Sequence, residues 1–282
     1  MPVSQTKKIL YINLTEQTFE IKSHDDYWQY LGGVGLGAKV LSTLEDKAGI
    51  IFSVGPLNGF FPFASKTSVL YRSGGTLHDS YLGGSLSWRL RFTGLDSIVL
   101  TGQAKEPVLI DIVDEAVSFK TADVSLDDLG LPGKQSSLEV SDKIILDGYF
   151  ESGESSLVDA LKNKNVAGMN VTGTKDFDIE DREKFQVAYD SVLAQIDKMT
   201  VEKGGNPSCA GCPMGCGESK VGEVDGNFLV HSLAACVFAE QIYSNPSIVF
   251  SCLDALGYGY THEEIEKSPS LTASLMEELR SL

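Results

Sequence analysis

The fold of this chain is decided by residues 50–110, which read IIFSVGPLNGFFPFASKTSVLYRSGGTLHDSYLGGSLSWRLRFTGLDSIVLTGQAKEPVLI. β-branched and apolar residues are concentrated in four runs of this region, a composition typical of strands. These runs are GIIFSVG (49–55), KTSVLYRS (66–73), DSIVLTG (96–102) and EPVLIDIVD (106–114). Glycine and proline punctuate the intervals, as expected for turns between strands.

The segments that flank this region extend the β-rich pattern. KILYINL (8–14) and TFEIK (18–22) are short apolar runs separated by three polar residues, which predicts a hairpin. AVSFK (116–120) is a further predicted strand. A helix is expected from about Asp26 to Leu44. Residues 8–120 are therefore predicted to be mostly β.

The pattern changes after residue 120. The polar, acidic stretch 121–153 is interpreted as a linker or shortened connection, and helical periodicity begins with EDREKFQVAYDSVLAQIDKM (180–199). Three more helical segments are expected at 229–242, at 247–256 and, as two short helices separated by Pro269, at the C-terminal end. The prediction is an α+β protein with a β-rich domain at 1–175 and a helical domain at 176–282.

Composition narrows the class of protein. The chain has 282 residues, of which 42% are hydrophobic, and a formal net charge of −16. Such an acidic chain disfavours binding to nucleic acid or to anionic membranes. The N-terminal residues contain no apolar run long enough for a signal peptide, and no window approaches a membrane span. A cytoplasmic protein with no membrane partner is expected.

The strongest chemical motif is a cysteine loop, NPSCAGCPMGCGES (206–219). Cys209, Cys212 and Cys216 have the spacing C-x2-C-x3-C, and thiolates this close can converge on one iron–sulfur cluster or metal ion. A cubane cluster needs a fourth ligand, for which Cys236, Cys252 and a partner chain are candidates. Cys236 and Cys252 lie in apolar segments, where either could equally be a buried core residue. Zinc is the main alternative to a cluster.

A second motif is the glycine run LGGVGLGAK (31–39) at the start of the expected helix. Glycines such as Gly32, Gly33 and Gly35 allow close backbone approach, and the unpaired amides of a helix start can bind a phosphate. The same glycines could serve only to permit a tight contact between helix and sheet. The segment before the run is no buried strand, so the dinucleotide-binding fingerprint is not met.

Taken in order, these segments resemble the tungsten-containing aldehyde ferredoxin oxidoreductase family. The resemblance is carried by five pieces: ILYINLTEQTFEI, YLGGVGLGAKVL, the stretch 50–110, ALKNKNVAGMNVTGTKDFDIEDREKF and SCAGCPMGCGE. It covers residues 8–120 well and 160–260 more loosely. It implies a β-rich base domain, a [4Fe–4S] cluster on Cys209, Cys212 and Cys216, and a tungstopterin beside Gly32, Gly33 and Gly35.

The chain also departs from this family. Members are about twice as long, so the C-terminal part that supplies the fourth cluster cysteine and much of the substrate cavity is expected to be missing. Val34 stands where the family has a phosphate-binding arginine. The acidic segment ILDGYFESGESSLVD (145–159) replaces a second phosphate-binding segment, and Gly259 replaces an aspartate of the pterin motif that begins at Asp254. These changes remove charge-assisted contacts to tungstopterin.

Three functions are compatible with these residues. The favoured hypothesis is an electron-transfer or accessory subunit that binds one [4Fe–4S] cluster and is completed by another chain or a second copy. A ferredoxin-like carrier would then be a partner. The first alternative is a catalytic oxidoreductase that converts aldehydes to acids, with a tungsten or molybdenum pterin held across an assembly. The second is a non-catalytic paralogue or scaffold.

Overall fold

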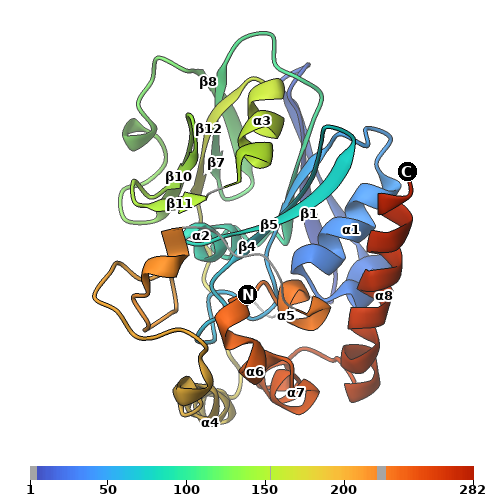
Figure 1. Cartoon of the computed structure of the whole chain (residues 1–282), viewed down its shortest axis with the longest axis vertical. Coiled ribbons are helices and arrows are strands. Elements are labelled where there is room, and N and C mark those ends of the chain that lie inside the picture. The colour runs from blue at the N-terminus through green and yellow to red at the C-terminus, as the bar shows by residue number, and fades with distance from the viewer. Residues whose placement is uncertain (1–4, 153, 221–226) are drawn as a thin grey trace.

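The computed structural model describes residues 5–152, 154–220 and 227–282, and it contains two six-stranded sheets with helices around them (Figure 1). The first sheet lies beside helices α1 and α8, and the second lies at the upper left of the same view. The predicted α+β fold is confirmed. Within the described ranges, no helix combines the length and the apolar composition needed to cross a bilayer.

The first sheet has the strand order β2-β1-β6-β3-β4-β5. Its strands are β1 (Lys7–Asn13), β2 (Thr18–His24), β3 (Ile50–Ser53), β4 (Thr67–Ser73), β5 (Thr76–Leu82) and β6 (Ser97–Thr101). β1 and β2 form the predicted hairpin, closing at the pair Asn13 and Thr18. β1 runs parallel to β6, whereas every other pairing in this sheet is antiparallel.

The second sheet repeats this arrangement, with the order β11-β10-β9-β12-β7-β8. Its strands are β7 (Val108–Val113), β8 (Ala116–Thr121), β9 (Gln135–Val140), β10 (Ile144–Leu146), β11 (Phe150–Ser152) and β12 (Val166–Thr172). Here β7 runs parallel to β12, as β1 does to β6. In each sheet, the first two strands along the chain form a hairpin, and the last strand along the chain pairs in parallel with the first. The sequence itself shows no visible repeat.

The prediction of a linker at 121–153 is wrong, because this stretch supplies three strands of the second sheet. Leu138, Ile144 and Leu146 point into the core, while neighbours such as Glu139 face solvent. The runs are only three to six residues long and are half polar, so they resemble loop sequence. Pairing stabilises them: β9 pairs with β12, β10 with β9, and β11 with β10.

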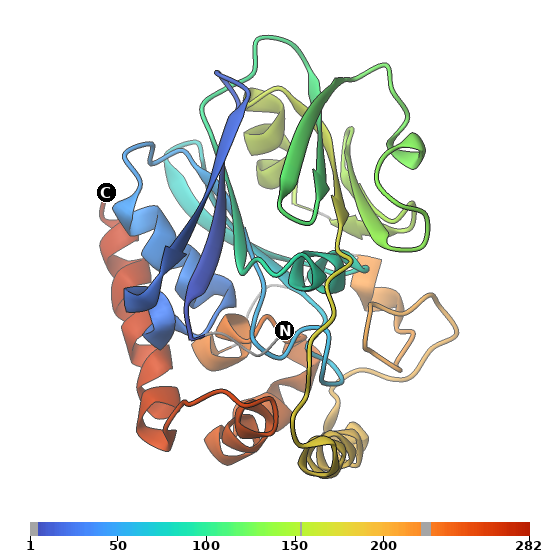
Figure 2. The same ribbon diagram turned by 180° about the vertical axis from the view of Figure 1, so that it is seen from behind.

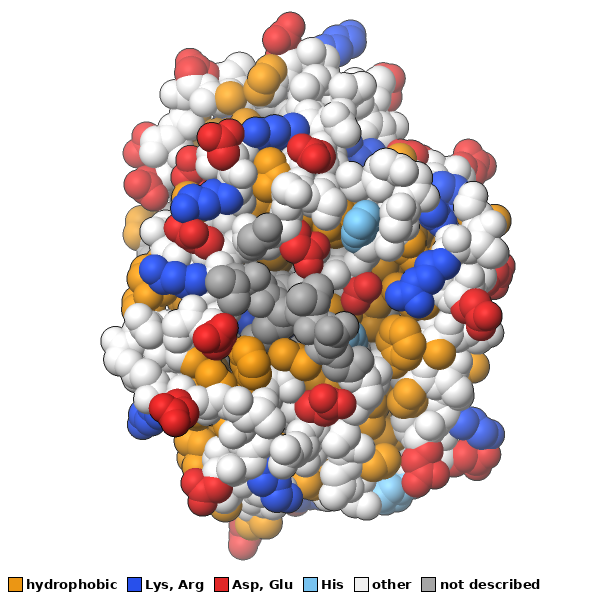
Figure 3. Space-filling view, in the orientation of Figure 1, with side chains coloured by type: hydrophobic (Ala, Val, Ile, Leu, Met, Phe, Trp, Pro, Cys, Tyr) orange, Lys and Arg blue, Asp and Glu red, His pale blue; other side chains and the backbone are white. Residues whose placement is uncertain are grey.

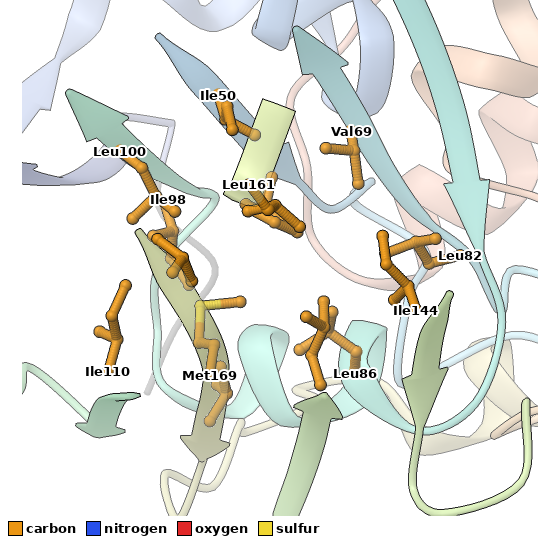
Figure 4. Close-up of a cluster of buried hydrophobic side chains, with 14 of the residues drawn as sticks. Ile50, Val69, Leu82, Leu86, Ile98, Leu100, Ile110, Ile144, Leu161 and Met169 are labelled. Atoms are coloured by element: carbon orange, nitrogen blue, oxygen red, sulfur yellow. The ribbon is translucent and has the colours of Figure 1, made fainter. Parts of the chain in front are cut away.

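The two sheets share one apolar core, in which side chains from both meet (Figure 4). It is formed by Ile50, Val69, Leu82, Leu86, Ile98, Leu100, Ile110, Ile144, Leu161 and Met169, among others. Two short helices contribute to it: α2 (Leu86–Phe92) precedes β6, and α3 (Ser155–Asn163) precedes β12. Neither helix was predicted from the sequence.

The remaining helices differ in detail from those predicted. They are α1 (Gly33–Thr43), α4 (Arg182–Leu193), α5 (Phe228–Ser232), α6 (Glu240–Tyr243), α7 (Pro246–Ala255) and α8 (His262–Arg280). Short 3₁₀ helices include η1 (Asp25–Tyr30), η3 (Ile196–Lys198), η4 (Gly217–Lys220) and η5 (Val237–Ala239). The helix expected at 26–44 is divided at Leu31 (φ 47°), and the one expected at 229–242 is broken at Ala234 (φ 48°).

The prediction of two short C-terminal helices is also wrong, because α8 continues through Pro269. Thr261 and Glu264 form a capping box that fixes the start of the helix, and Ser268, just before the proline, is fully buried. A proline in a helix removes one hydrogen bond. Packing of the buried face of α8 against α1 and α5 offsets this cost.

The C-terminal helices are not separate from the sheets. In Figures 1 and 2, α8 lies along α1, which in turn covers the first sheet. Two clusters of buried apolar side chains contain residues from the β-rich part and from the C-terminal helices. One includes Leu70 of β4 and Met276 of α8, and the other includes Phe63 and Leu253 of α7. The domain boundary near residue 175 stays a prediction.

A buried lysine joins the two ends of the chain. Lys7 Nζ donates a hydrogen bond to the Leu31 carbonyl (2.5 Å) and lies 5.1 Å from the centre of the Trp28 ring. Trp28 stacks on Tyr260 at 3.8 Å, just before α8. Burial lowers the pKa of Lys7 to about 8, although the nearby Asp96 carboxylate opposes this shift.

This lysine gives stability a distinct pH dependence. Between about pH 8 and the ordinary lysine pKa of 10.5, the folded chain has lost a proton that the unfolded chain still holds. Unfolding then takes up a proton, so the contribution of Lys7 to stability rises with pH across this window, by up to about 3 kcal/mol. The raised pKa values of the Cys212 and Cys252 thiols act in the opposite direction, so the comparison is made with a variant that lacks Lys7. Urea unfolding at pH 7.5 and pH 10 should show this contribution as a change in stability that is more positive in wild-type protein and in Lys105→Met, a control at an exposed lysine, than in Lys7→Met. Lys7→Met should lack it, and parallel pH curves for all three proteins would contradict the assignment.

Candidate metal centre

The cysteine loop is a pair of tight turns between η3 and η4, drawn in orange at the left of Figure 1. Gly211 (φ 77°) and Gly215 (φ 54°) supply the left-handed conformations that these turns require. The Cys212 amide donates to the Cys209 carbonyl (3.0 Å), which closes the first turn. The Asn206 amide donates to the Gly215 carbonyl (3.0 Å), which ties the second turn to the residues that precede the loop.

The loop is attached to the first sheet through Gly83 and Gly84. The Ala210 amide donates to the Gly84 carbonyl at 3.0 Å. A Cβ added to Gly83 would lie 2.8 Å from Cys209 Sγ and 3.5 Å from Lys66 Nζ. The missing side chain at Gly83 therefore leaves the space in which a thiol and a buried ammonium group come close. Lys66 is 1% exposed.

The three loop thiols lie close enough to influence one another. Cys209 is buried, and Cys212 and Cys216 are partly buried. Burial raises the pKa of the Cys212 thiol to about 11, with further increases from Cys209 and Cys216, while Lys66 acts in the opposite direction. Metal binding requires thiolates, so loading the loop would release protons and place negative charge beside Lys66.

Cys236 is linked to the loop through the backbone of Phe63. The Phe63 amide donates to the Gly211 carbonyl (3.3 Å), and the Phe63 carbonyl accepts from the Cys236 amide (2.9 Å). Three residues further on, the Lys66 amide donates to the Ala234 carbonyl (3.0 Å). The segment 63–66 thus lies between the cysteine loop and the turn that carries Cys236.

A single asparagine organises this region. The Asn58 side chain is fully buried and makes four hydrogen bonds: its oxygen accepts from the Gly55 amide (2.5 Å), and its nitrogen donates to the carbonyls of Ala64 (2.8 Å), Lys66 (3.3 Å) and Ala234 (3.4 Å). It therefore fixes both sides of the segment next to the cysteines.

Cys252 lies in a different place. It is 1% exposed on α7, and burial raises its thiol pKa to about 12. It lines a cavity of about 410 Å³ between α4 and α7, next to the ion pair of Lys184 and Asp254 (2.6 Å). Cys209 and Cys212 instead line a cavity of about 480 Å³. The structure brings the three loop cysteines together and leaves Cys252 apart from them.

The loop fits an iron–sulfur cluster by the chemistry of its donors. It supplies three thiols on one glycine-rich turn beside a positive side chain, a set that suits a thiolate-ligated cluster. In the part of the chain that the structure describes, no three His, Cys, Asp or Glu side chains already form one ligand set. Binding would therefore require the thiols to turn toward a common centre.

The glycine run makes close contacts inside the protein. Added Cβ atoms would lie 2.5 Å from the Val54 carbonyl at Gly32, 2.1 Å from the His231 carbonyl at Gly33, and 2.8 Å from Thr272 Oγ1 at Gly35. The Gly33 amide donates to the Val54 carbonyl (3.0 Å). These glycines allow α1 to pack tightly against α5 and α8. Their role in binding a pterin stays a prediction.

The positions that correspond to the family's pterin contacts do not fit an anionic pterin. Val34 is fully buried in apolar surroundings. Glu154, in the segment that the resemblance relates to phosphate binding, accepts hydrogen bonds from Tyr71 (2.8 Å) and Ser80 (2.5 Å), and its carboxylate has the wrong charge for a phosphate. A Cβ on Gly259 would lie 2.5 Å from Gln5 Nε2. Each position is occupied by contacts within this chain.

Two mixed six-stranded sheets that share one core, with a three-cysteine loop attached to the first sheet through Gly84, define an α+β protein with a candidate thiolate metal centre. Residues 9–146 match the family model described as aldehyde ferredoxin oxidoreductase, N-terminal domain. Residues 9–146 therefore match the N-terminal domain of the aldehyde ferredoxin oxidoreductase family, and the resemblance expected from the sequence is confirmed there.

Individual relatives extend the match beyond this domain. Tungsten-containing aldehyde ferredoxin oxidoreductases of Pyrococcus furiosus and Pyrococcus abyssi are 24% and 26% identical over 235 and 233 residues. Each match covers 71% of this chain but only 38% of the relative, so the chain spans about two fifths of their length. The aliphatic sulfonate oxidoreductase WOR-like subunit of Pyrococcus furiosus is 30% identical over 130 residues, which cover 41% of this chain and 21% of that protein.

One solved structure shares the fold over nearly the whole chain. It is the active-site complex BamBC of benzoyl coenzyme A reductase with 1,5-dienoyl-CoA, with a TM-score of 0.64 and 16% sequence identity. The match covers 96% of this chain and 63% of that one. At this identity, the likeness shows a common fold.

Sequence reasoning identified the cysteines but missed Asn58 and the position of Lys66. Asn58 occurs in a Pro-Leu-Asn-Gly turn, where an asparagine usually serves only the local backbone. Its contact with Ala234 crosses 176 residues. No spacing rule connects positions so far apart, so only the fold reveals this link.

Removing the Asn58 side chain should weaken the whole centre. Asn58→Ala leaves one buried amide and three buried carbonyls without this partner, so we expect a loss of about 3 kcal/mol in the free energy of unfolding. Iron uptake should fall with it, because the segments on both sides of residues 63–66 lose their common anchor. Urea unfolding measures the first effect, and Asn163→Ala, at an exposed helix end, should stay within about 0.5 kcal/mol. Equal stability of the two variants would contradict the role given to Asn58.

Proposed function

We propose that this chain binds one [4Fe–4S] cluster through Cys209, Cys212 and Cys216 and transfers electrons as a subunit of an oxidoreductase assembly. The observation that carries the proposal is the juxtaposition of three mutually interacting thiols on a loop anchored to the sheet. In such a centre the cluster supplies the electron chemistry. The protein holds the thiolates, shields them from solvent and places Lys66 nearby to offset negative charge.

Cys236 is the favoured fourth ligand within the chain. The Cys236 amide donates to the Phe63 carbonyl, and the Phe63 amide donates to Gly211 of the loop, so a single residue connects Cys236 to the loop. Cys252 is the weaker candidate because it lines the separate cavity between α4 and α7. A cysteine from a partner chain is the third possible source, since the chain spans only about two fifths of the tungsten-containing relatives that it matches.

The subunit role is supported by the names of similar proteins. One relative is named a WOR-like subunit, and the structurally similar chain comes from a complex named BamBC. Acidic side chains are spread over the face shown in Figure 3, and the net charge is −16. A partner or electron carrier with a basic docking surface suits this charge.

A catalytic role with a tungsten or molybdenum pterin is the alternative, as in the tungsten-containing relatives. The pterin would have to be held largely by another chain, because Val34, Glu154 and Gly259 do not fit it here. A non-catalytic scaffold is the remaining alternative, and it predicts that the cysteines stay without metal.

Single cysteine variants separate these possibilities. Anaerobic reconstitution of wild-type chain should give roughly four iron and four sulfide per chain. Cys209→Ser, Cys212→Ser and Cys216→Ser should each lose the bound iron, because a hydroxyl is a poor ligand for the cluster. Cys236→Ser should lose iron as well, whereas Cys252→Ser, the matched control at another buried cysteine, should load like the wild type.

The other results are equally informative. If Cys236→Ser loads normally, the fourth ligand comes from elsewhere. If wild-type chain remains colourless and free of iron, cluster binding is wrong and the scaffold role is supported. Tungsten or molybdenum found with the native complex would favour the catalytic alternative.

A further inference from the structure

Trp88 places a buried hydrogen-bond donor next to the cysteine loop. It lies on α2, and both ribbon views show α2 beside the orange segment that contains η4 (Figures 1 and 2). Its indole nitrogen, Nε1, is shielded from solvent, yet no described atom accepts a hydrogen bond from it. Because an indole N–H can only donate, it needs an acceptor to offset the cost of its burial.

The edge of the indole that carries the nitrogen lies close to Gly211 of the loop. A Cβ on Gly211 would lie 3.1 Å from Trp88 Nε1, 3.2 Å from Cζ2 and 3.4 Å from Cε2. Gly211 is the middle residue between Ala210 and Cys212, and its positive φ and missing side chain permit this approach. The Gly211 carbonyl already accepts a hydrogen bond from the Phe63 amide.

Space for an acceptor exists beside this edge. The cavity of about 480 Å³ is lined by Trp88 together with Cys209, Gly211 and Cys212. The rest of its lining is mostly apolar and aromatic, namely Gly59, Phe60, Phe61, Pro62, Tyr189, Leu193, Ser208 and Pro213. The Trp88 side chain and the two cysteines therefore line the same largely apolar cavity, where a sulfur ligand or cluster sulfide would be a suitable acceptor.

We propose that the Trp88 indole donates a hydrogen bond to a sulfur of the cluster held by the loop and thereby raises the reduction potential of the cluster. This inference rests on the proposed function. Reduction adds negative charge to the sulfurs, and an N–H donor in a shielded site stabilises that charge. Trp88 would be a positioning residue that tunes the centre, and it is not a ligand.

Substitution of the two tryptophans tests this role. Trp88→Phe keeps an aromatic ring but removes the donor, and Trp28→Phe makes the same change at the only other tryptophan, which stacks on Tyr260. In a dye-mediated redox titration followed by electron paramagnetic resonance, Trp88→Phe should have a more negative potential than both the wild type and Trp28→Phe. A loaded Trp88→Phe protein with the wild-type potential would overturn the proposal.

A second measurement avoids dependence on the Trp88 variant. In the Trp28→Phe protein with ¹⁵N-labelled indole, Trp88 is the only labelled ring, and electron spin-echo modulation of the reduced cluster should show coupling to ¹⁵N. A reduced cluster without this coupling overturns the hydrogen bond, even if Trp88→Phe fails to fold. Failure of the wild type to take up iron is a separate result, which refutes the proposed function itself.

Discussion

The hydrogen bonds of the Asn58 side chain are the constraint on which the candidate centre depends. One buried amide contacts the backbone at Gly55, Ala64, Lys66 and Ala234, and so joins the first sheet to the helical region. The segment that it holds then reaches the cysteine loop through Phe63. A polar group buried this deeply is stable only when its donors and acceptors are satisfied, so the surrounding backbone has little freedom to move.

The same fold explains why the glycine run and the cysteine loop carry different functional weight. At Gly32, Gly33 and Gly35, an added Cβ would come within 2.1–2.8 Å of atoms from neighbouring segments, so the missing side chains permit close packing of α1. Glu154, in the segment that would contact a phosphate, is likewise satisfied within the chain, by Tyr71 and Ser80. The cysteine loop is different, because Cys209 and Cys212 line a cavity together with Trp88, whose indole N–H has no acceptor among the described residues. These differences are the reason why we propose electron transfer and keep pterin chemistry as the alternative.

The sequence was sufficient for local features with strong patterns. The β1–β2 hairpin, helix α4 and the clustering of three cysteines followed from apolar periodicity and residue spacing. Short strands such as Ile144–Leu146 could not be recognised, since three residues carry too little periodicity and only tertiary pairing makes them strands. Pro269 suggested a helix end, but the packing of α8 overrode it. Long-range contacts, such as that of Asn58 with Ala234, leave no local signal.

The central claim is that the loop of Cys209, Cys212 and Cys216 holds a cubane cluster. Mössbauer spectroscopy of the chain reconstituted with ⁵⁷Fe and sulfide under anaerobic conditions tests it most directly. Nearly all of the iron should give the signal of valence-delocalised pairs, which is typical of an oxidised [4Fe–4S] cluster. Iron present only as isolated high-spin ions, or a loop that takes up zinc and excludes iron, would contradict it.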